Sequence, residues 1–408
     1  MHDVFGDRLR DLRIRAGLTI EALAGASGVS VRAISDTERG RNRAPRARTV
    51  AALAAALRLG PGDAAAFAAL ARAGWDPGVP AGRPRAGELP RRTAEFVGRE
   101  AELAVLGDRV TTEAPASVTV LHGPPGVGKT ALAIRAAELH RHRFPGGALH
   151  VDLRGTAPEP AAPGDVQAVL FRALGVPPRR IAADADERAG QLRALLGRRR
   201  CLLVLDDAAG EAQVRELLPG AGSVLITSRR PLGGLAAVRR CAVTPLPLAD
   251  AVALLRTAGA EPGTEEELVA VARLCGHLPL ALRLAANRLA GGGTGRLIAE
   301  LADADRRLTA LSTEDTGVEA AFAVSYERLG GPARTLFRRL AWVPTEPFGA
   351  ADLAGYDPLT AEDLLEELLD SGLLQPEGAD RYRMHELIRL YAAGRLRAEE
   401  PWHRSHSA

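Results

Sequence analysis

The beginning of the chain alternates short apolar-periodic segments with single glycines, which predicts a bundle of short helices. The apolar positions of the first segment recur near helical spacing, at Phe5, Leu9, Leu12 and Ile14. Thr19 and Ser30 are placed as N-caps of the second and third helices, and a glycine separates these helices. Two short helices joined by such a turn indicate a helix-turn-helix, with its third helix over 31–39. Further helices are expected over 49–57 and 63–71.

The pattern changes after residue 74. Residues 75–92 contain four prolines and several glycines, which is typical of a partly stiff linker. Beyond the linker, apolar runs of the kind found in buried parallel strands occur at 118–122, 201–205 and 223–228. A helix is expected over 131–141, after the first of these runs. This order predicts an α/β domain with a parallel sheet over 93–240, followed by mostly helical segments.

Charge and cysteine content narrow the class of protein. Residues 1–74 hold 12 Arg and 7 acidic residues, a net charge of +5, whereas the remainder holds 41 basic and 43 acidic residues, a net charge of −2. The basic excess at the N-terminus indicates a polyanionic partner there. The three cysteines form no C-x-x-C pair, and no apolar run is long enough to span a bilayer. We therefore expect a cytoplasmic protein with no disulfide framework, no zinc site and no membrane partner.

The run GLTIEALAGASGVSVRAISDTERG, residues 17–40, resembles the Cro/phage-repressor (XRE-type) family, and the resemblance extends over about residues 5–73. It implies that the third helix enters the major groove of double-stranded DNA. The positions that match base-contacting positions, with the N-cap, are Ser30, Val31, Arg32, Ser35 and Asp36. Arg32 suits a guanine edge, Val31 a thymine methyl group and Asp36 a cytosine amine. The arginines that follow suit phosphate contacts: Arg39, Arg41, Arg43, Arg46 and Arg48.

A glycine-rich motif follows the strand expected at 118–122. Its pattern is G-x-x-x-x-G-K-T, and its residues are Gly123, Pro124, Pro125, Gly126, Val127, Gly128, Lys129 and Thr130. Glycines allow backbone amides to approach phosphate oxygens, and the N-terminus of the following helix favours negative charge. Lys129, the only lysine in the chain, would reach the β- and γ-phosphates, and the Thr130 hydroxyl would bind Mg²⁺. The motif in this strand–loop–helix context predicts binding of ATP or ADP with Mg²⁺.

Charged residues at the ends of the other two strands complete the expected site. Asp206 and Asp207 follow the strand at 201–205. Asp206 is predicted to hold Mg²⁺, and Asp207 is predicted to polarise the attacking water as the catalytic group. Arg229 follows the strand at 223–228 and is a candidate sensor of the γ-phosphate, because ligands bind at this edge of open α/β sheets.

Three further stretches occur in a specific order around the glycine-rich loop and the Asp206 strand: FVGREAEL at 96–103, GHLPLA at 276–281 and RYRMHEL at 381–387. Together the five motifs resemble the NB-ARC branch of the STAND ATPases, and in particular actinomycete regulators, over about residues 93–397. The resemblance implies that Arg99 touches the nucleotide, that Pro279 packs on the adenine and that His385 meets the β-phosphate of ADP. The usual Met-His-Asp triplet ends in Glu386 here, which keeps the charge on a longer side chain.

The resemblance also implies a multidomain α and α/β fold. After the helix-turn-helix domain at 1–74 and the linker, we expect a P-loop nucleotide domain at 93–240, a helical bundle at 241–312, a winged-helix domain at 313–398 and a tail at 399–408. No internal repeat of 20–50 residues is visible, so no C-terminal sensor repeats are expected.

These expectations combine into an ATP/ADP-switched DNA-binding regulator. ADP would favour a closed form, ATP an open form that self-associates as a homo-oligomer, and slow ATP hydrolysis would reset the switch. The prediction leaves room for a separate sensor or effector protein. Two alternatives stay open: a signalling or defence hub whose N-terminal helices bind protein, and a motor-type ATPase acting on DNA. Sequence-selective DNA binding would exclude the hub, and fast DNA-stimulated turnover would favour the motor.

Overall fold

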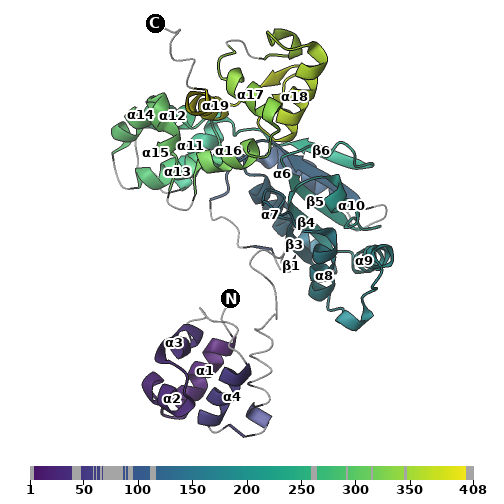
Figure 1. Cartoon of the computed structure of the whole chain (residues 1–408), viewed down its shortest axis with the longest axis vertical. Helices are drawn as coiled ribbons and strands as arrows, with labels where there is room; N and C mark the ends of the chain where they lie inside the picture. Colours follow the sequence, from purple (N-terminus) through teal and green to yellow (C-terminus); the bar gives the residue numbers. More distant parts are fainter. Residues whose placement is uncertain are drawn as a thin grey trace. The chain divides into compact units, whose positions relative to one another are not determined.

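The structure, a computed structural model, describes most of the chain. The described residues are 4–38, 47–57, 59–60, 62–64, 67, 86–87, 89–90, 95–110, 116–258, 264–290, 293–313, 316–343 and 347–400. They belong to two compact units, residues 1–83 and 84–408, and each unit is treated by itself below (Figure 1).

The first unit is a bundle of short helices, as its apolar pattern predicts. Its helices are α1 (Val4–Arg15), α2 (Ile20–Ser27), α3 (Val31–Glu38) and α4 (Ala47–Ala56). The Thr19 hydroxyl caps α2 by accepting from the Ala22 amide over 3.1 Å, and Gly28 ends α2 with a φ of 69°. Leu9, Leu23 and Ile34 are fully buried between the helices. Ile14, although it shares the helical spacing of Leu9, is 60% exposed.

A charged pair joins the ends of α1 and α3. Arg13 donates from Nε and Nη2 to the two carboxylate oxygens of Glu38, over 2.6 and 2.8 Å, and its Nη1 donates to the Leu18 carbonyl over 2.9 Å. The two side chains are only 12% and 7% exposed. The Glu38 hydrogen bonds raise the pKa of Arg13 despite its burial. The pair therefore fixes the C-terminal end of the third helix against the first.

We expect Arg13→Ala to destabilise the first unit by roughly 2 kcal/mol, because it leaves the Glu38 carboxylate buried without its partner. For a domain of this size such a loss lowers the melting temperature by about 10 °C. Differential scanning calorimetry of the whole chain would measure it. Arg10→Ala, which removes an exposed arginine of the same helix, is the matched control; an equal shift in both variants would contradict a specific role for the pair.

The second unit contains a sheet in which five described strands run parallel. The strands are β1 (Ala86–Gly87), β2 (Ser117–His122), β3 (Ala148–Asp152), β4 (Leu202–Ala208), β5 (Ser223–Ser228) and β6 (Val238–Ala242). Their order is β1-β3-β4-β5-β2-β6, and only β1 is antiparallel to its neighbour. The three apolar runs are thus strands of a parallel sheet, as predicted, and they occupy its centre. β3 and β6, which flank them, were not predicted.

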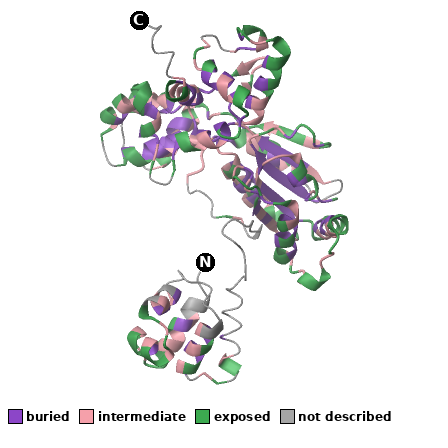
Figure 2. Ribbon diagram, viewed as in Figure 1, coloured by how far each residue is buried: buried purple, intermediate pink, exposed green. Residues whose placement is uncertain are grey.

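Alternate residues of each central strand point to opposite faces of the sheet. Leu203 and Leu205 join a core formed with α8 (Pro163–Ala173) and α9 (Ala185–Arg199), whereas Leu202 and Val204 join a core formed with α6 (Glu100–Arg109) and α7 (Lys129–His140). Figure 2 shows the buried strands between exposed outer helix surfaces. A sheet covered on both faces explains why its central strands are almost continuously apolar.

Helices make up most of the rest of the second unit. The first group consists of α11 (Leu248–Thr257), α12 (Glu265–Leu274), α13 (Pro279–Leu289), α14 (Thr294–Ala302) and α15 (Ala304–Ala310). The C-terminal segment consists of α16 (Val318–Tyr326), α17 (Gly331–Leu340), α18 (Pro358–Asp370), the antiparallel strands β7 (Gln375–Pro376) and β8 (Tyr382–Arg383), and α19 (Glu386–Glu399). α16 and α17 are separate helices, and Gly330 is the N-cap of α17.

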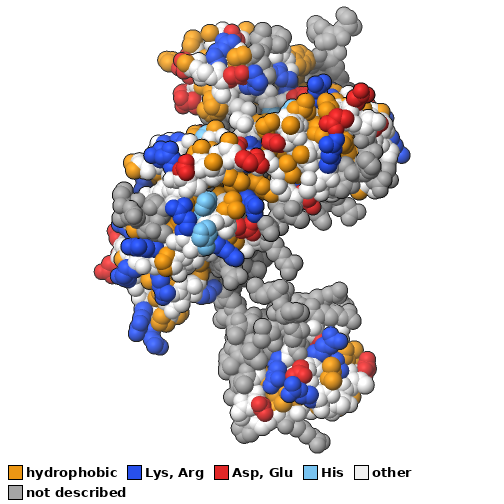
Figure 3. All heavy atoms as spheres, turned by 180° about the vertical axis from the view of Figure 1, so that it is seen from behind, with side chains coloured by type: hydrophobic (Ala, Val, Ile, Leu, Met, Phe, Trp, Pro, Cys, Tyr) orange, Lys and Arg blue, Asp and Glu red, His pale blue; other side chains and the backbone are white. Residues whose placement is uncertain are grey.

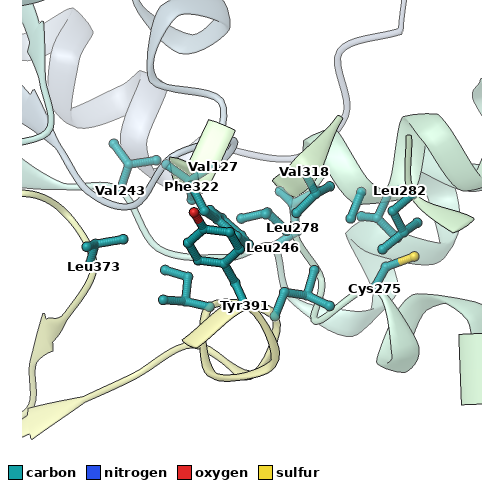
Figure 4. Packing of buried hydrophobic residues seen from close by; sticks show 14 of the residues in the cluster. Val127, Val243, Leu246, Cys275, Leu278, Leu282, Val318, Phe322, Leu373 and Tyr391 are labelled. Atoms are coloured by element: carbon teal, nitrogen blue, oxygen red, sulfur yellow. The ribbon is translucent and has the colours of Figure 1, made fainter. Parts of the chain in front are cut away.

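A single apolar core connects the sheet, the first helical group and the C-terminal segment. It includes Val127 of the glycine-rich loop, Leu278 before α13, Phe322 of α16 and Tyr391 of α19. In Figure 4 these side chains surround one another, with Tyr391 at the centre of the group. The C-terminal segment is therefore packed directly against the loop that joins β2 to α7. Among the described helices, none combines the length and apolarity that a membrane span requires.

Candidate nucleotide-binding site

The glycine-rich loop Gly123–Thr130 joins β2 to α7 at the carboxyl edge of the sheet. Gly123, Gly126 and Gly128 have φ values of 149°, 78° and 95°. A Cβ atom at Gly123 would lie 2.3 Å from the Val243 carbonyl oxygen, so only glycine allows this approach. Gly128 is the N-cap of α7, which directs the N-terminal amides of that helix toward the loop. The loop thus has the form that phosphate groups require.

Lys129 folds back across this loop. Its ammonium group donates to the carbonyl oxygens of Gly123 and Pro124 over 2.8 and 2.9 Å. Burial, reinforced by the nearby Arg229, lowers the pKa of Lys129 to about 7. The ammonium group is therefore held at the mouth of the loop in surroundings that lack enough negative charge to match it.

Thr130 and Asp206, the two residues predicted to hold Mg²⁺, lie in contact with each other. The Thr130 hydroxyl donates to Asp206 Oδ1 over 2.8 Å, and Thr227 of β5 donates to the same oxygen over 2.5 Å. Although burial opposes it, the nearby His150 ring, whose Nε2 lies 3.8 Å from Oδ2, and hydrogen bonds from Thr227 and Thr130 lower the pKa of Asp206. The described residues contain no group of three metal-ligating side chains. A hydroxyl and one carboxylate fit Mg²⁺, which takes its other ligands from water and phosphate.

Asp207 points to a different neighbour from Asp206. The pairing of β4 with β5 shifts register between Leu205 and Ala208, and Asp207 has a φ of 54°. Such a bulge redirects side chains. The Asp207 carboxylate accepts from the amide and the hydroxyl of Thr156, each over 2.7 Å. Asp207 therefore does not share the Thr130 contact of Asp206, and Thr156 was missed in the sequence.

A cavity of about 540 Å³ adjoins the loop and has the size expected for a small-molecule site. Its lining includes Phe96, Val97, Lys129, Thr130 and Pro279. Pro279 is the first residue of α13, where its fixed φ suits the helix start, and it borders the cavity. The cavity is thus lined both by apolar residues and by the glycine-rich loop, a combination that suits a nucleotide.

Arg99 lines the same cavity, but its hydrogen bonds go to the protein. It donates to the carbonyl oxygens of Val127 and Thr244, over 3.2 and 2.6 Å, and to Glu102 over 2.7 Å. It lies in the left-handed region at a φ of 72° and is buried. These hydrogen bonds make Arg99 a brace for the glycine-rich loop, a role that its place in the FVGREAEL stretch did not reveal.

Arg229 and His385 contact other segments of the second unit. Arg229 donates to Ser325 Oγ and, over 3.3 Å, to the Ala321 carbonyl of α16, and burial lowers its pKa to about 10. His385 caps α19: its Nδ1 accepts from the Leu387 amide over 3.2 Å, so its Nε2 carries the proton and donates to the Gly276 carbonyl over 2.9 Å. His385 is not among the residues that line the cavity. The hydrogen bond between His385 and Gly276 thus joins two of the sequence motifs, GHLPLA at 276–281 and RYRMHEL at 381–387.

Few of the predicted DNA-contacting side chains are described. Val31 is 43% exposed, Ser35 is half-buried, and the Ser30 hydroxyl caps α3 by accepting from Ala33 over 3.3 Å. The side chains of Arg32 and Asp36 and the whole of Arg39, Arg41 and Arg43 lie outside the described residues. On the face of this unit seen in Figure 3, basic and acidic side chains are interspersed.

Comparison with known families supports the two expected domains. A model described as "Helix-turn-helix domain" matches residues 4–67, and one described as "AAA domain" matches residues 112–216. The second range contains the glycine-rich loop, Asp206 and Asp207. The predictions of a helix-turn-helix domain and of a nucleotide-binding P-loop domain are therefore confirmed.

Two curated relatives are similar over most of the chain. Regulatory protein AfsR of Streptomyces griseus is 40% identical over 329 residues, covering 77% of this chain and 34% of the relative. AfsR of Streptomyces coelicolor is 38% identical over 326 residues, covering 76% and 33%. The chain thus spans about a third of the length of these relatives. Among solved structures, a STAND protein with a tetratricopeptide repeat sensor from Pyrococcus horikoshii aligns with a TM-score of 0.38 at 19% identity, over 75% of this chain and 43% of that one.

Proposed function

We propose that this chain, which carries a helix-turn-helix domain ahead of a P-loop domain and is homologous to the AfsR regulatory proteins, is a DNA-binding transcriptional regulator switched by ATP and ADP. One observation carries the proposal: the C-terminal segment contacts Arg229, the candidate γ-phosphate sensor, and the first residue of the glycine-rich loop. A Cβ atom at Gly372, just after α18, would lie 3.3 Å from both the Gly123 carbonyl oxygen and Arg229 Cβ. Ser325 of α16 binds the Arg229 guanidinium.

The closed arrangement depends on these contacts and on the shared core. Arg229, the candidate γ-phosphate sensor, is bound to α16, so the C-terminal segment and a γ-phosphate would compete for its donors. ADP, which lacks that phosphate, would leave Arg229 with α16 and preserve the closed form. A nucleotide can shift this equilibrium only by its difference in affinity for the two forms. Arg229 is where we place that difference.

The remaining site residues would have roles either in binding the nucleotide and Mg²⁺ or in ATP hydrolysis. Lys129 and the loop amides would hold the phosphates, and Pro279 with Phe96 would contact the base. Thr130 and Asp206 would hold Mg²⁺, which neutralises charge on the phosphates when bound. Asp207 would accept a proton from the attacking water in a slow reaction that resets the switch. His385 would act through Gly276 to hold α19 against the first helical group, rather than by touching phosphate directly.

Release of the C-terminal segment would produce the form that self-associates. Several helix-turn-helix domains in one homo-oligomer would bind neighbouring DNA sites with a gain from effective concentration alone. A separate sensor or effector protein would set when release occurs. α18 presents carboxylates near Arg229, Arg230 and Arg328, and such a partner could release the segment by binding these charged groups in place of one another.

The whole chain is expected to bind double-stranded DNA with an affinity that falls steeply as salt rises, by about 0.9 log units per log unit of salt for each phosphate contact. Arg32→Ala should relax sequence preference, whereas Arg41→Ala should weaken binding to all sequences alike. Selection from a random duplex library, followed by titration at several salt concentrations, measures both. Absence of binding to any duplex at low salt would instead favour a protein-recruiting role for the N-terminal helices.

A further inference from the structure

The loop that follows β3, residues 154–157, packs backbone against backbone on the end of β4. The Gly155 amide donates to the Asp207 carbonyl oxygen over 2.6 Å. A Cβ atom at Gly155 would lie 2.2 Å from that oxygen, so only glycine allows so close an approach. Arg154, which precedes it, has a φ of 51°. This loop was not singled out in the sequence, and its conformation is specified by contacts far along the chain.

Thr156 binds the side chain of Asp207 with both of its donors. Its amide nitrogen and its hydroxyl each donate to Oδ2 of Asp207 over 2.7 Å. Both donors bind the same oxygen, so they fix the direction in which the carboxylate points. A carboxylate held toward residues 154–157 is not free to turn toward a water molecule at the γ-phosphate. Thr156 therefore controls the group that we expect to assist hydrolysis.

The same loop is held from the C-terminal segment by Arg328, two residues after α16. Its Nη1 donates to the Gly155 carbonyl and its Nη2 to the Ala157 carbonyl. A planar guanidinium that bridges two carbonyls of one loop fixes the orientation of the intervening residue, here Thr156. Arg328 lies on the same cavity as Asp207, Arg229 and Ser325, a cavity of about 460 Å³ between the sheet edge and α18. The loop is thus gripped by the segment that also binds Arg229.

We propose that Thr156 is a positioning residue for Asp207, held in place by Arg328, and that together they slow ATP hydrolysis while the C-terminal segment is docked. The inference rests on the proposed nucleotide switch. In hydrolysis the water oxygen bonds to the γ-phosphorus, the bond to the bridging oxygen breaks with its electron pair leaving on ADP, and a water proton passes to an acceptor. While Thr156 holds Oδ2, the Asp207 carboxylate is kept turned toward residues 154–157 and away from that water. Removal of Arg328 lets residues 154–157 move and frees the carboxylate to turn.

Single-turnover hydrolysis of ATP by the whole chain with Mg²⁺ tests this. Thr156→Val keeps the side-chain volume and loses the hydroxyl donor, whereas Thr156→Ser keeps the donor. We expect hydrolysis to be roughly three- to tenfold faster for Thr156→Val, the effect of one hydrogen bond, and unchanged for Thr156→Ser. The dissociation constant for ATP, measured without turnover, should stay within about twofold, because only the rate step is affected.

Arg328→Ala should accelerate hydrolysis by a similar factor, and the double variant should be no faster than the faster single variant, because both substitutions release one element. Arg339→Ala, which removes an exposed arginine of α17, is the matched control and should leave the rate unchanged. Hydrolysis that is slower or unchanged in Thr156→Val, with ATP binding intact, overturns the inference. Failure of the unaltered chain to bind ATP would overturn the proposed function instead.

Discussion

Lys129→Ala is expected to abolish retention of ADP or ATP by the purified chain. The ammonium group is the only cation of the glycine-rich loop, and it supplies charge-assisted hydrogen bonds to phosphate that no neighbouring arginine replaces. Loss of two such bonds costs roughly 3 kcal/mol or more, which is about a hundredfold in affinity. Nucleotide content after purification and calorimetric titration with Mg²⁺-ADP would measure the loss.

The lowered pKa of Lys129 gives this prediction a second readout. Because the pKa of Lys129 lies at about 7 without nucleotide, much of this lysine is neutral at pH 8. Phosphate binding favours its charged form. Binding at pH 8 should therefore take up a proton, and affinity should fall as pH rises above 7. Titrations in buffers of different ionisation enthalpy would show the uptake in the unaltered chain and not in Lys129→Ala. Arg141→Ala, an exposed residue just after α7, should bind and take up protons normally.

Gly276→Ala is expected to release the C-terminal segment from the first helical group. Gly276 has a φ of 56°, and an added Cβ would lie 2.5 Å from Cε1 of the His385 ring. Alanine there carries a conformational cost of roughly 1–2 kcal/mol and also displaces the ring. The hydrogen bond from His385 to the Gly276 carbonyl, and the cap that His385 provides to α19, would be strained or lost. The closed form should lose several kcal/mol in total.

Light scattering coupled to size exclusion would detect the outcome, since the released form is the one expected to self-associate. Gly295→Ala on α14 is a matched control, because an added Cβ there meets no atom within 4 Å. His385→Ala removes the ring and should make Gly276→Ala less harmful, since the displaced group is gone. A Gly276→Ala chain that stays monomeric with ATP and unfolds at the unaltered temperature would show that this contact does not hold the segment.

The parts of the site that follow one another along the chain were predictable. The loop at 123–130, the strand before it and the helix after it are specified by local residue types, and the structure places them as expected. Thr130 and Asp206 lie side by side because parallel strands bring their carboxyl ends to one edge, whereas their role as Mg²⁺ ligands stays a prediction. Such features depend on periodicity and spacing, which a single sequence displays.

Features that depend on distant packing were missed. β6 has two arginines in five residues and pairs with β2 alone, so it lacks the apolar run of a central strand. β3 alternates half-buried and buried positions and includes His150, which hides its strand character. Arg328 reaches the two residues that flank Thr156 only because α16 packs near the sheet edge, and neither Thr nor Arg is informative by itself. The hydrogen bonds from Arg99 to the carbonyl oxygens of Val127 and Thr244 could not be inferred from the sequence motif, because both partners lie far along the chain.

The core that includes Val127 and Tyr391 would make the proposed opening an all-or-none event. The apolar side chains between the glycine-rich loop and α19 would have to separate together. Partial separation would expose apolar surface to water without freeing the nucleotide site. After separation, both apolar faces would be exposed to water, and they could be buried again against the same face of a second molecule. The apolar core of the closed form would thus become the interface of the homo-oligomer.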